Sequence, residues 1–199
     1  MTRRFAIFSV LMLIAAWFTP VSFAALNGAP TEFIESLGNQ ALQVIRSDMG
    51  PDQKLAYFHE MLHQDFDMVG VSRFVLGPYW RSADQHERQE FVRLVSDDLV
   101  RFYRTRFTQY LGETFQVTGS GSDPAGLIVT SQILRPNGPP IEVDWRLSER
   151  GGLYKISDVI VDGVSMALSQ RQTFSHQIQR SGGRVAGLLE LMRHQTLSY

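Results

Sequence analysis

The stretch IEVDWRL, residues 141–147, alternates strictly between apolar and polar side chains. Successive side chains of a β-strand point to opposite faces, so this stretch predicts a strand with one face on a core and the other toward solvent. Three more strands are predicted nearby, at 114–118, 127–134 and 153–161. The connections between the four are too short for parallel crossovers, and we therefore expect an antiparallel meander.

Glycine pairs and a phase change divide this strand block. The Gly-Ser-Gly sequence at 119–121 is typical of a hairpin turn, and Gly151-Gly152 predicts the turn before the last strand. Within the last strand the apolar alternation changes phase at Ser157-Asp158, which predicts a β-bulge there.

Helical periodicity fills the rest of the chain, with apolar residues recurring at spacings of three and four. The expected helices before the strands are 31–47, 51–64 and 82–111, and two more follow Asp162-Gly163, separated by Gly182-Gly183. The helix that begins at Ser82 has a capping-box pattern with Gln85. At 1.5 Å per residue it would be about 40 Å long, enough to lie across a whole sheet.

These elements together predict an α+β domain. We expect a curved four-stranded antiparallel sheet with helices packed on one face, and helical segments at both the N- and C-terminal ends. Such an NTF2-like cone encloses an apolar interior, which suits either a greasy ligand or catalysis in a dry cleft. The fold alone does not decide between these functions.

Composition excludes several classes of function. The chain has 199 residues, 19 Lys and Arg against 20 Asp and Glu, and no cysteine. Nucleic-acid-binding proteins usually carry a clear basic excess, so no nucleic-acid partner is expected. The absence of cysteine from the sequence excludes thiol nucleophiles, thiolate zinc sites and iron–sulfur clusters.

The first 24 residues have the layout of a secretory signal peptide. Arg3 and Arg4 precede an apolar run from 5 to 18, and small residues end the segment at Ala24. The apolar run is shorter than the roughly 20 residues that a membrane-spanning helix needs. We therefore expect cleavage after Ala24 and a single exported domain at 25–199.

A literal HExxH motif, His59-Glu60-Met61-Leu62-His63, lies on the second predicted helix. Two histidines at i and i+4 share a helix face and can bind zinc, with Glu60 as general base. The extended form of the motif would need glycine and histidine where the chain has Phe66 and Val69. The short motif is nevertheless complete, so a zinc metallopeptidase that uses His59, Glu60 and His63 stays an alternative.

Carboxylates offer few further catalytic possibilities. A third zinc ligand of the glutamate type would have to be Glu87 or Glu90, at the start of the long helix. Asp158, at the predicted bulge, is the one candidate for a general base inside the cone, and a bulge residue whose side chain bonds to backbone is the simpler interpretation.

Three segments resemble one protein family. They are FVLGPYWR at 74–81, ERQEF at 87–91 and YKISDVIVDGVSM at 154–166, and together they are similar to the MlaC family of periplasmic phospholipid-binding proteins, also called toluene-tolerance auxiliary proteins. The similarity extends from about residue 33 to about 192. A related branch from hopanoid-producing bacteria, HpnM, shares this architecture, and the residues do not separate the two branches.

The resemblance implies a lipid carrier and not an enzyme. It implies that a phospholipid is the ligand, with no cofactor and no metal, and that the protein is a monomer that shuttles lipid between the outer and inner membranes. The implied partners are an inner-membrane ABC transporter complex and an outer-membrane lipoprotein–porin complex.

The expected lipid pocket lies between the apolar face of the sheet and the long helix. Its predicted lining is Val129, Val143, Trp145, Val159 and Val161 from the strands, Leu94, Val95, Leu99, Phe102 and Tyr103 from the long helix, and Leu76, Trp80, Val164 and Met166 at the rim.

Overall fold

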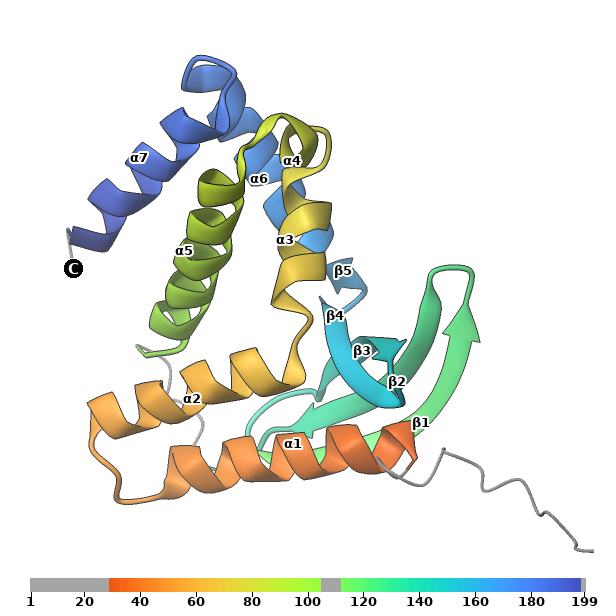
Figure 1. Cartoon of the computed structure of the whole chain (residues 1–199). Helices are drawn as coiled ribbons and strands as arrows, with labels where there is room; N and C mark the ends of the chain where they lie inside the picture. The colour runs from red at the N-terminus through yellow and green to blue at the C-terminus, as the bar shows by residue number, and fades with distance from the viewer. Residues whose placement is uncertain (1–28, 105–111, 198–199) are drawn as a thin grey trace, which may run out of the picture.

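The computed structural model describes residues 29–104 and 112–197, with the side chains of 102–104 and 195–197 outside the described part. Two parts lie one above the other in Figure 1: a lower part of two helices and the sheet, and an upper part of helices. The helices are α1 (Pro30–Arg46), α2 (Pro51–Asp65), α3 (Met68–Leu76), α4 (Tyr79–Ser82), α5 (Gln85–Arg104), α6 (Met166–Arg180) and α7 (Val185–Leu197). The α+β class is confirmed.

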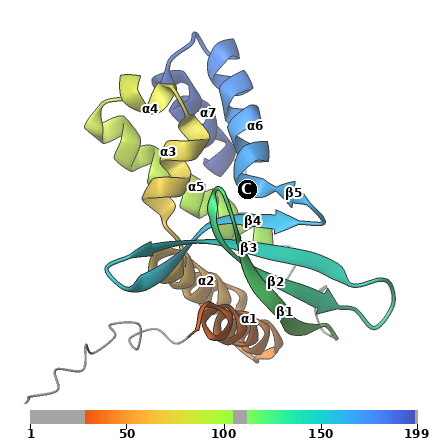
Figure 2. The same cartoon turned by 90° about the vertical axis from the view of Figure 1, so that its right-hand side faces the viewer.

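The sheet is a curved antiparallel meander, as Figure 2 shows. Its order is β1-β2-β3-β4-β5, and every neighbouring pair is antiparallel. The strands are β1 (Thr114–Asp123), β2 (Gly126–Leu134), β3 (Ile141–Arg150), β4 (Leu153–Val161) and β5 (Val164–Ser165). The expected count of four is one strand short, because the chain after the turn at 162–163 pairs briefly with β4 before α6 begins.

Two irregularities test the turn and bulge predictions. Arg146 pairs with Asp158 while Leu147 pairs with Ile156, so the predicted bulge in β4 is confirmed. The turn predicted at 119–121 is wrong: β1 continues through these glycines after a register shift between Val117 and Gly119. Glycine tolerates strand conformation, and here it lies on the half of β1 that is largely exposed.

Helix α1, and not the long helix α5, packs on β1 and covers the apolar face of the sheet. Ile34 and Leu37 of α1 are buried in one cluster with Val129 and Leu147 of the sheet. The fit depends on glycine, since a Cβ added at Gly38 would lie only 2.3 Å from the Phe115 ring. The prediction that the long helix lies across the sheet is therefore wrong for its described residues, which pack on α2, α3 and α7.

The long helix also begins later than predicted. Asp84 Oδ1 accepts a 2.8 Å hydrogen bond from the Glu87 backbone, and Glu87 Oε2 accepts a 2.9 Å bond from the Asp84 backbone. This reciprocal pair forms the capping box. Ser82 instead ends α4, where its hydroxyl donates to the Tyr79 carbonyl at 3.0 Å.

A short junction joins the helical part to the sheet. Phe66 pairs with Ile156 of β4 as an isolated parallel bridge, and the Asp67 backbone donates to the Ile156 carbonyl at 2.9 Å. The Asp67 carboxylate then caps α3 by accepting from the Gly70 backbone at 3.0 Å. The upper helices are therefore anchored on the sheet beside its bulge.

Within the described residues, no helix combines the length and the apolar character that crossing a membrane requires.

Candidate functional site

The buried apolar side chains form two separate clusters. The helical cluster includes Leu76, Leu94 and Val95, with Trp80 and Leu99 packed against it. The sheet cluster includes Val129, with Trp145 and Val159 packed against it, and lies against α1. Phe66 contacts both clusters. The predicted pocket lining is thus divided between two cores that meet at the α2–α3 junction.

The remaining predicted lining residues fall into three groups. Val143 is buried at 4% exposure in the middle of β3, and Val161 at the end of β4 is half-buried. Val164 and Met166 are exposed at 53% and 39%, at the edge of the sheet and the start of α6. The side chains of Phe102 and Tyr103 lie outside the described residues.

The apolar interior of the sheet is fixed by one buried polar link. The Trp145 indole donates to Ser131 Oγ at 2.9 Å, and the Ser131 hydroxyl donates to the Val143 carbonyl at 2.7 Å. The Trp145 ring also meets the Phe115 ring edge-on, with centroids 6.2 Å apart. These contacts satisfy the indole N–H and hold the ring in one orientation under α1.

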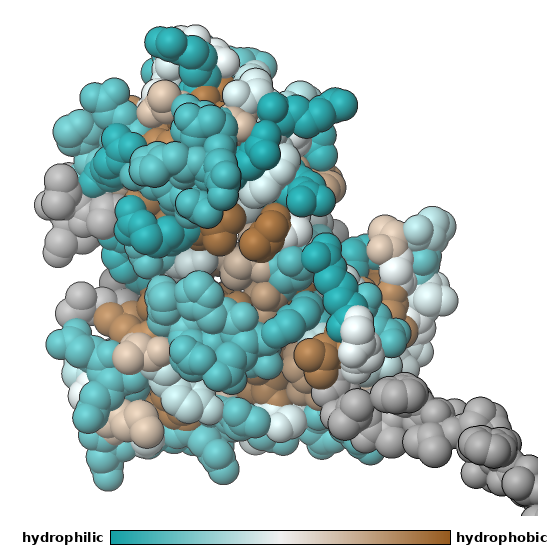
Figure 3. All heavy atoms as spheres, viewed as in Figure 1, coloured by the Kyte–Doolittle hydropathy of each residue, from teal (hydrophilic) through white to brown (hydrophobic). Residues whose placement is uncertain are grey.

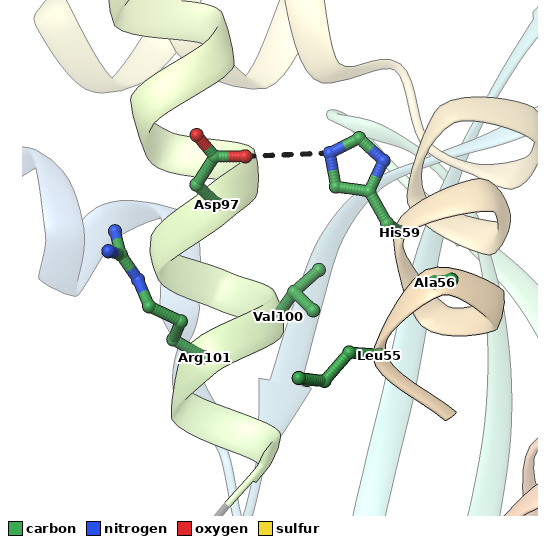
Figure 4. A pocket seen from close by; sticks show the side chains of 6 residues that line it. All are labelled: Leu55, Ala56, His59, Asp97, Val100 and Arg101. Carbon is green, nitrogen blue, oxygen red and sulfur yellow. Dashed lines mark ion pairs between the residues drawn. The ribbon is translucent and has the colours of Figure 1, made fainter. Parts of the chain in front are cut away.

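A groove opens on the side of the helical cluster, between α2 and α5. Its volume is about 370 Å³, and Figure 4 shows the six side chains that line it: Leu55, Ala56, His59, Asp97, Val100 and Arg101. Leu55 and Val100 belong to the helical cluster, so the groove leads directly onto the apolar core. Figure 3 shows apolar surface between polar surfaces where the upper helices meet the lower part of the molecule.

The rim of the groove is polar. His59 Nε2 on α2 lies 3.5 Å from Asp97 Oδ1 on α5, and the dashed line in Figure 4 marks this ion pair. Arg93, one helical turn away, contacts Asp97 Oδ2 at 3.0 Å. An apolar floor with a charged rim suits an amphipathic ligand whose tail is buried and whose polar end stays near water.

Burial and ion pairing have opposite effects on the pKa of Asp98, which follows the groove residue Asp97 in α5. Burial raises the pKa of the Asp98 carboxyl above its ordinary value of 3.8, and the neighbouring Arg101 guanidinium partly offsets this. Arg101 forms an ion pair with Asp98 and also lines the groove. The charged side chains of the groove, Asp97 and Arg101, therefore lie at its edge, and the floor residues Leu55 and Val100 are apolar.

A second hollow, of about 430 Å³, lies between α1 and β1. It is lined mainly by polar side chains, Asn39, Gln43, Arg46 and Thr114, together with Leu42 and Phe115. Phe115 connects this hollow to the sheet cluster, but four of its six lining side chains are polar. The groove between α2 and α5 is the better candidate for an apolar ligand.

The HExxH histidines do not form a metal centre within the described residues. The His59 and His63 rings lie 4.8 Å apart, but no group of three or more potential ligands occurs among the residues that the structure describes. Glu60 is exposed and accepts from Gln64 at 2.5 Å.

The two possible glutamate ligands are engaged elsewhere. Glu87 caps α5, and Glu90 accepts two 2.7 Å hydrogen bonds from Arg193 of α7. Asp158 has the capping role: it accepts from the Ser165 hydroxyl at 2.5 Å and from the Ala167 backbone at 2.9 Å, at the start of α6. Among the described residues, the motif therefore has no third ligand of the kind that zinc sites use.

Comparison with known families decides where the chain belongs. The profile of the MlaC protein family matches residues 35–194, which is most of the described chain. The chain belongs to the MlaC family. This membership confirms that the chain is not an enzyme: one relative is named a toluene tolerance protein and another a binding protein of a phospholipid transport system.

Two curated relatives of this MlaC-family chain are informative. The toluene tolerance protein ttg2D of Pseudomonas putida is 24% identical over 184 residues, which cover 86% of this chain and 82% of the relative. The intermembrane phospholipid transport system binding protein MlaC of Haemophilus influenzae is 24% identical over 133 residues, covering 64% of this chain and 56% of the relative.

One solved structure shares the fold. A phospholipid-binding protein from Ralstonia solanacearum, solved in complex with a phospholipid, matches with a TM-score of 0.70 and 19% identity. The match covers 84% of this chain and 96% of that one. At this identity the likeness shows the α+β architecture of the MlaC-family chain and nothing further about its ligand.

Sequence reasoning missed most of the groove. None of the predicted lining residues lies on it, and only His59 had been singled out for another reason. Leu55 does belong to the apolar stripe of α2, so its burial was readable from helical spacing. Its neighbour Val100 comes from a helix more than 40 residues away, and no local pattern brings the two together.

Proposed function

We propose that this MlaC-family chain is a carrier that binds the acyl chains of a phospholipid in its apolar interior. The observation that carries the proposal is the family match over residues 35–194. The fold shared with a protein that was solved in complex with a phospholipid supports it. The groove between α2 and α5 supplies the opening that such a ligand needs.

The physical task explains why an apolar interior is required. Each buried CH₂ contributes about 0.8 kcal/mol, so two acyl chains with roughly 30 methylenes carry on the order of 25 kcal/mol. A carrier has to shield nearly all of this surface, since otherwise the lipid stays in the bilayer. The affinity of the carrier for the lipid also has to be close to that of the bilayer, so that partners can drive transfer in either direction.

The proposed path runs from the groove into the boundary between the two clusters. Ligand pockets are usually about 300–1,000 Å³, and the 370 Å³ of the groove is near the lower end of that range. Two chains need more room, so the proposal requires α5 and its neighbours to move away from the lower part of the molecule. Phe66 marks that boundary because it contacts both clusters.

On this path the acyl chains would contact the predicted lining in both clusters. Leu76, Leu94 and Val95 would form the helical wall, and Val129 and Trp145 would form the sheet wall. The polar headgroup would remain at the rim near His59 and Asp97, and ligand choice would then depend more on the tails than on polar contacts.

The cellular setting is also part of the proposal. Residues 1–24 would direct export and be removed after Ala24, which leaves the domain 25–199 in the periplasm. There the protein would act as a monomer, exchanging lipid with an inner-membrane ABC transporter complex and with an outer-membrane lipoprotein–porin complex. Neither nucleic acid nor a cofactor has a place in this mechanism.

Mass spectrometry of an organic extract tests the proposal. Protein released from the periplasm under mild conditions should contain about one phospholipid per chain, and its intact mass should correspond to a start at Ala25. A hopanoid in place of phospholipid would assign the chain to the related branch, and an extract without lipid would contradict the carrier function. Stoichiometric zinc in the same sample would revive the metallopeptidase alternative.

A further inference from the structure

Helices α3 and α6 pack side by side and expose apolar side chains on the outside of the molecule. Val69 and Phe74 of α3 are 50% and 44% exposed, and Leu168 of α6 is 47% exposed. Isolated exposed apolar residues are common, but several on two packed helices point to a binding surface. The two helices face the viewer on the upper part of the molecule in Figure 2, away from α5.

The same two helices carry arginines and no acidic residue. Arg73 belongs to α3 and Arg171 to α6, and the sequences of α3, α4 and α6 contain no Asp or Glu. Neither arginine forms an ion pair with another described residue. Both rest on aromatic rings instead: Arg171 Cζ lies 5.1 Å from the Phe74 ring centroid, and Arg73 Cζ lies 5.7 Å from that of Trp80.

These side chains share one surface. Val69 and Arg73 are four residues apart on α3, and Leu168 and Arg171 are three apart on α6, so each pair lies on one side of its helix. The contact between Arg171 and Phe74 joins the two helices. We call this surface the docking face, and it consists of Val69, Arg73, Phe74, Leu168 and Arg171.

The acidic groups around the docking face lie outside α3, α4 and α6. Arg81 of α4 is exposed, and Arg88 lies 5.6 Å from the Trp80 ring on α4, so both add positive charge beside the face. Asp84 and Glu87 cap α5 and Asp158 caps α6, so these carboxylates are held at helix starts by backbone hydrogen bonds. Asp67 at the start of α3 caps that helix and pairs with Arg150 at 3.2 Å.

We infer that the docking face binds the surface of an anionic phospholipid bilayer. Apolar side chains among arginines suit the boundary between headgroups and acyl chains, where the cations meet lipid phosphates and the apolar groups leave water. The run of arginines without a nearby acidic side chain on α3, α4 or α6 matches the uniform negative charge of such a bilayer. The inference does not depend on the cargo, because the docking face and the groove share no residue.

Vesicle flotation tests this inference. The protein as the cell secretes it, with its N-terminus determined by intact mass, is mixed with vesicles of phosphatidylethanolamine and phosphatidylglycerol at 70:30, and with vesicles of pure phosphatidylcholine. We expect binding to the anionic vesicles that falls with added salt, and little binding to the neutral ones. The Arg73→Gln/Arg171→Gln variant should bind the anionic vesicles about tenfold more weakly.

A matched variant separates position from total charge. Lys54→Gln/Arg135→Gln removes two charges from α2 and from the β2–β3 connection, where both side chains donate to backbone carbonyls, and it should keep the binding of the parent protein. Phe74→Ser/Leu168→Ser should also weaken binding, because it removes the apolar contact without changing charge. Circular dichroism confirms that each variant is folded.

The outcomes decide between the possibilities. Equal loss in both charge-removing variants, or binding that ignores vesicle charge, would overturn the inference. So would unchanged binding after Phe74→Ser/Leu168→Ser, which would mean that charge alone attracts the vesicles and that the exposed apolar side chains do not enter the bilayer. Because lipid content is measured on the same samples, loss of vesicle binding with retained cargo would be distinguished from failure of the carrier function.

Discussion

His59 Nε2 on α2 lies 3.5 Å from Asp97 Oδ1 on α5, and this ion pair spans the mouth of the groove. The two residues come from the two parts of the molecule that have to separate if acyl chains are to reach both apolar clusters. A contact in this position restrains the opening without occupying the floor. The histidine of the HExxH motif thus has a structural explanation that needs no metal.

Removing this contact should speed lipid exchange. His59 is 41% exposed, and an exposed ion pair is worth about 0–1 kcal/mol, so His59→Ala should lower the free energy of unfolding by less than about 1 kcal/mol. Release of a fluorescent phospholipid to acceptor vesicles should become faster by at most about fivefold. His63→Ala is the control, because His63 is exposed and does not line the groove. Equal acceleration by both changes would show that the ion pair is not the restraint.

Filling the groove should displace lipid. Leu55 is half-buried on the groove floor, and Leu55→Trp adds a large apolar side chain there. Overpacking a closed core costs about 1–3 kcal/mol, but an open groove can accept the ring, so we expect a folded protein with clearly less extractable phospholipid.

The matched control for that change is Leu153→Trp. Leu153 is 48% exposed at the start of β4, and the same substitution there should leave lipid content unchanged. Phospholipid per chain is measured by mass spectrometry, and urea unfolding checks stability. Full lipid content in a folded Leu55→Trp protein would show that the ligand enters elsewhere.

A buried hydroxyl in α3 should be dispensable. Ser72 is fully buried, and its Oγ has no hydrogen-bond partner among the described residues. An unsatisfied buried polar group costs about 1–3 kcal/mol, so Ser72→Ala should raise the free energy of unfolding by about 1 kcal/mol. Ser96→Ala is the comparison, since Ser96 is equally buried but donates to the Val92 carbonyl at 2.9 Å. If urea unfolding shows Ser72→Ala to be the less stable of the two, the hydroxyl has a partner in solution, such as bound lipid.

Local patterns predicted the strands well because side chains alternate strictly between the two faces of a strand, so the apolar positions determine which face is buried. The alternation in 141–147 fixes which face of β3 is buried, and Val143 and Leu147 are indeed buried while Glu142 is exposed. The phase change in 153–161 likewise located the bulge, since an extra residue is the only way to keep both halves of β4 facing the same core.

Packing between helices and sheet was not predictable in the same way. Both α1 and α5 carry apolar stripes of helical period, so hydrophobicity alone allows either helix to cover the sheet. The choice depends on close fit: Gly38 lets α1 approach the Phe115 ring. A close contact between residues 77 positions apart produces no periodic pattern in the sequence. The sequence therefore did not show which helix covers the sheet, and the residues predicted to line one pocket lie in two clusters.

An ion pair between α5 and α7 should make stability depend on pH. Glu90 accepts 2.7 Å hydrogen bonds from both Arg193 Nε and Nη2, and these bonds lower the pKa of the Glu90 carboxyl below its ordinary value of 4.5. Because the folded pKa is the lower one, the stabilisation is fully present above about pH 4.5 and is lost as the pH falls through the folded pKa.

Glu90→Gln should therefore lower the free energy of unfolding at pH 7 by about 1 kcal/mol. This effect is smaller than that of breaking a buried charged pair, because the Arg193 side chain is 49% exposed and water screens the interaction. The difference from the parent protein should shrink as the pH falls from 7 to 3, because protonation of Glu90 makes it uncharged like glutamine. Glu149→Gln, an exposed change at the end of β3, should show no such pH-dependent difference. Urea unfolding of the three proteins at pH 7 and pH 3 measures these values, and a deficit for Glu90→Gln that is as large at pH 3 as at pH 7 would mean that packing of the side chain, and not its charge, joins α5 to α7.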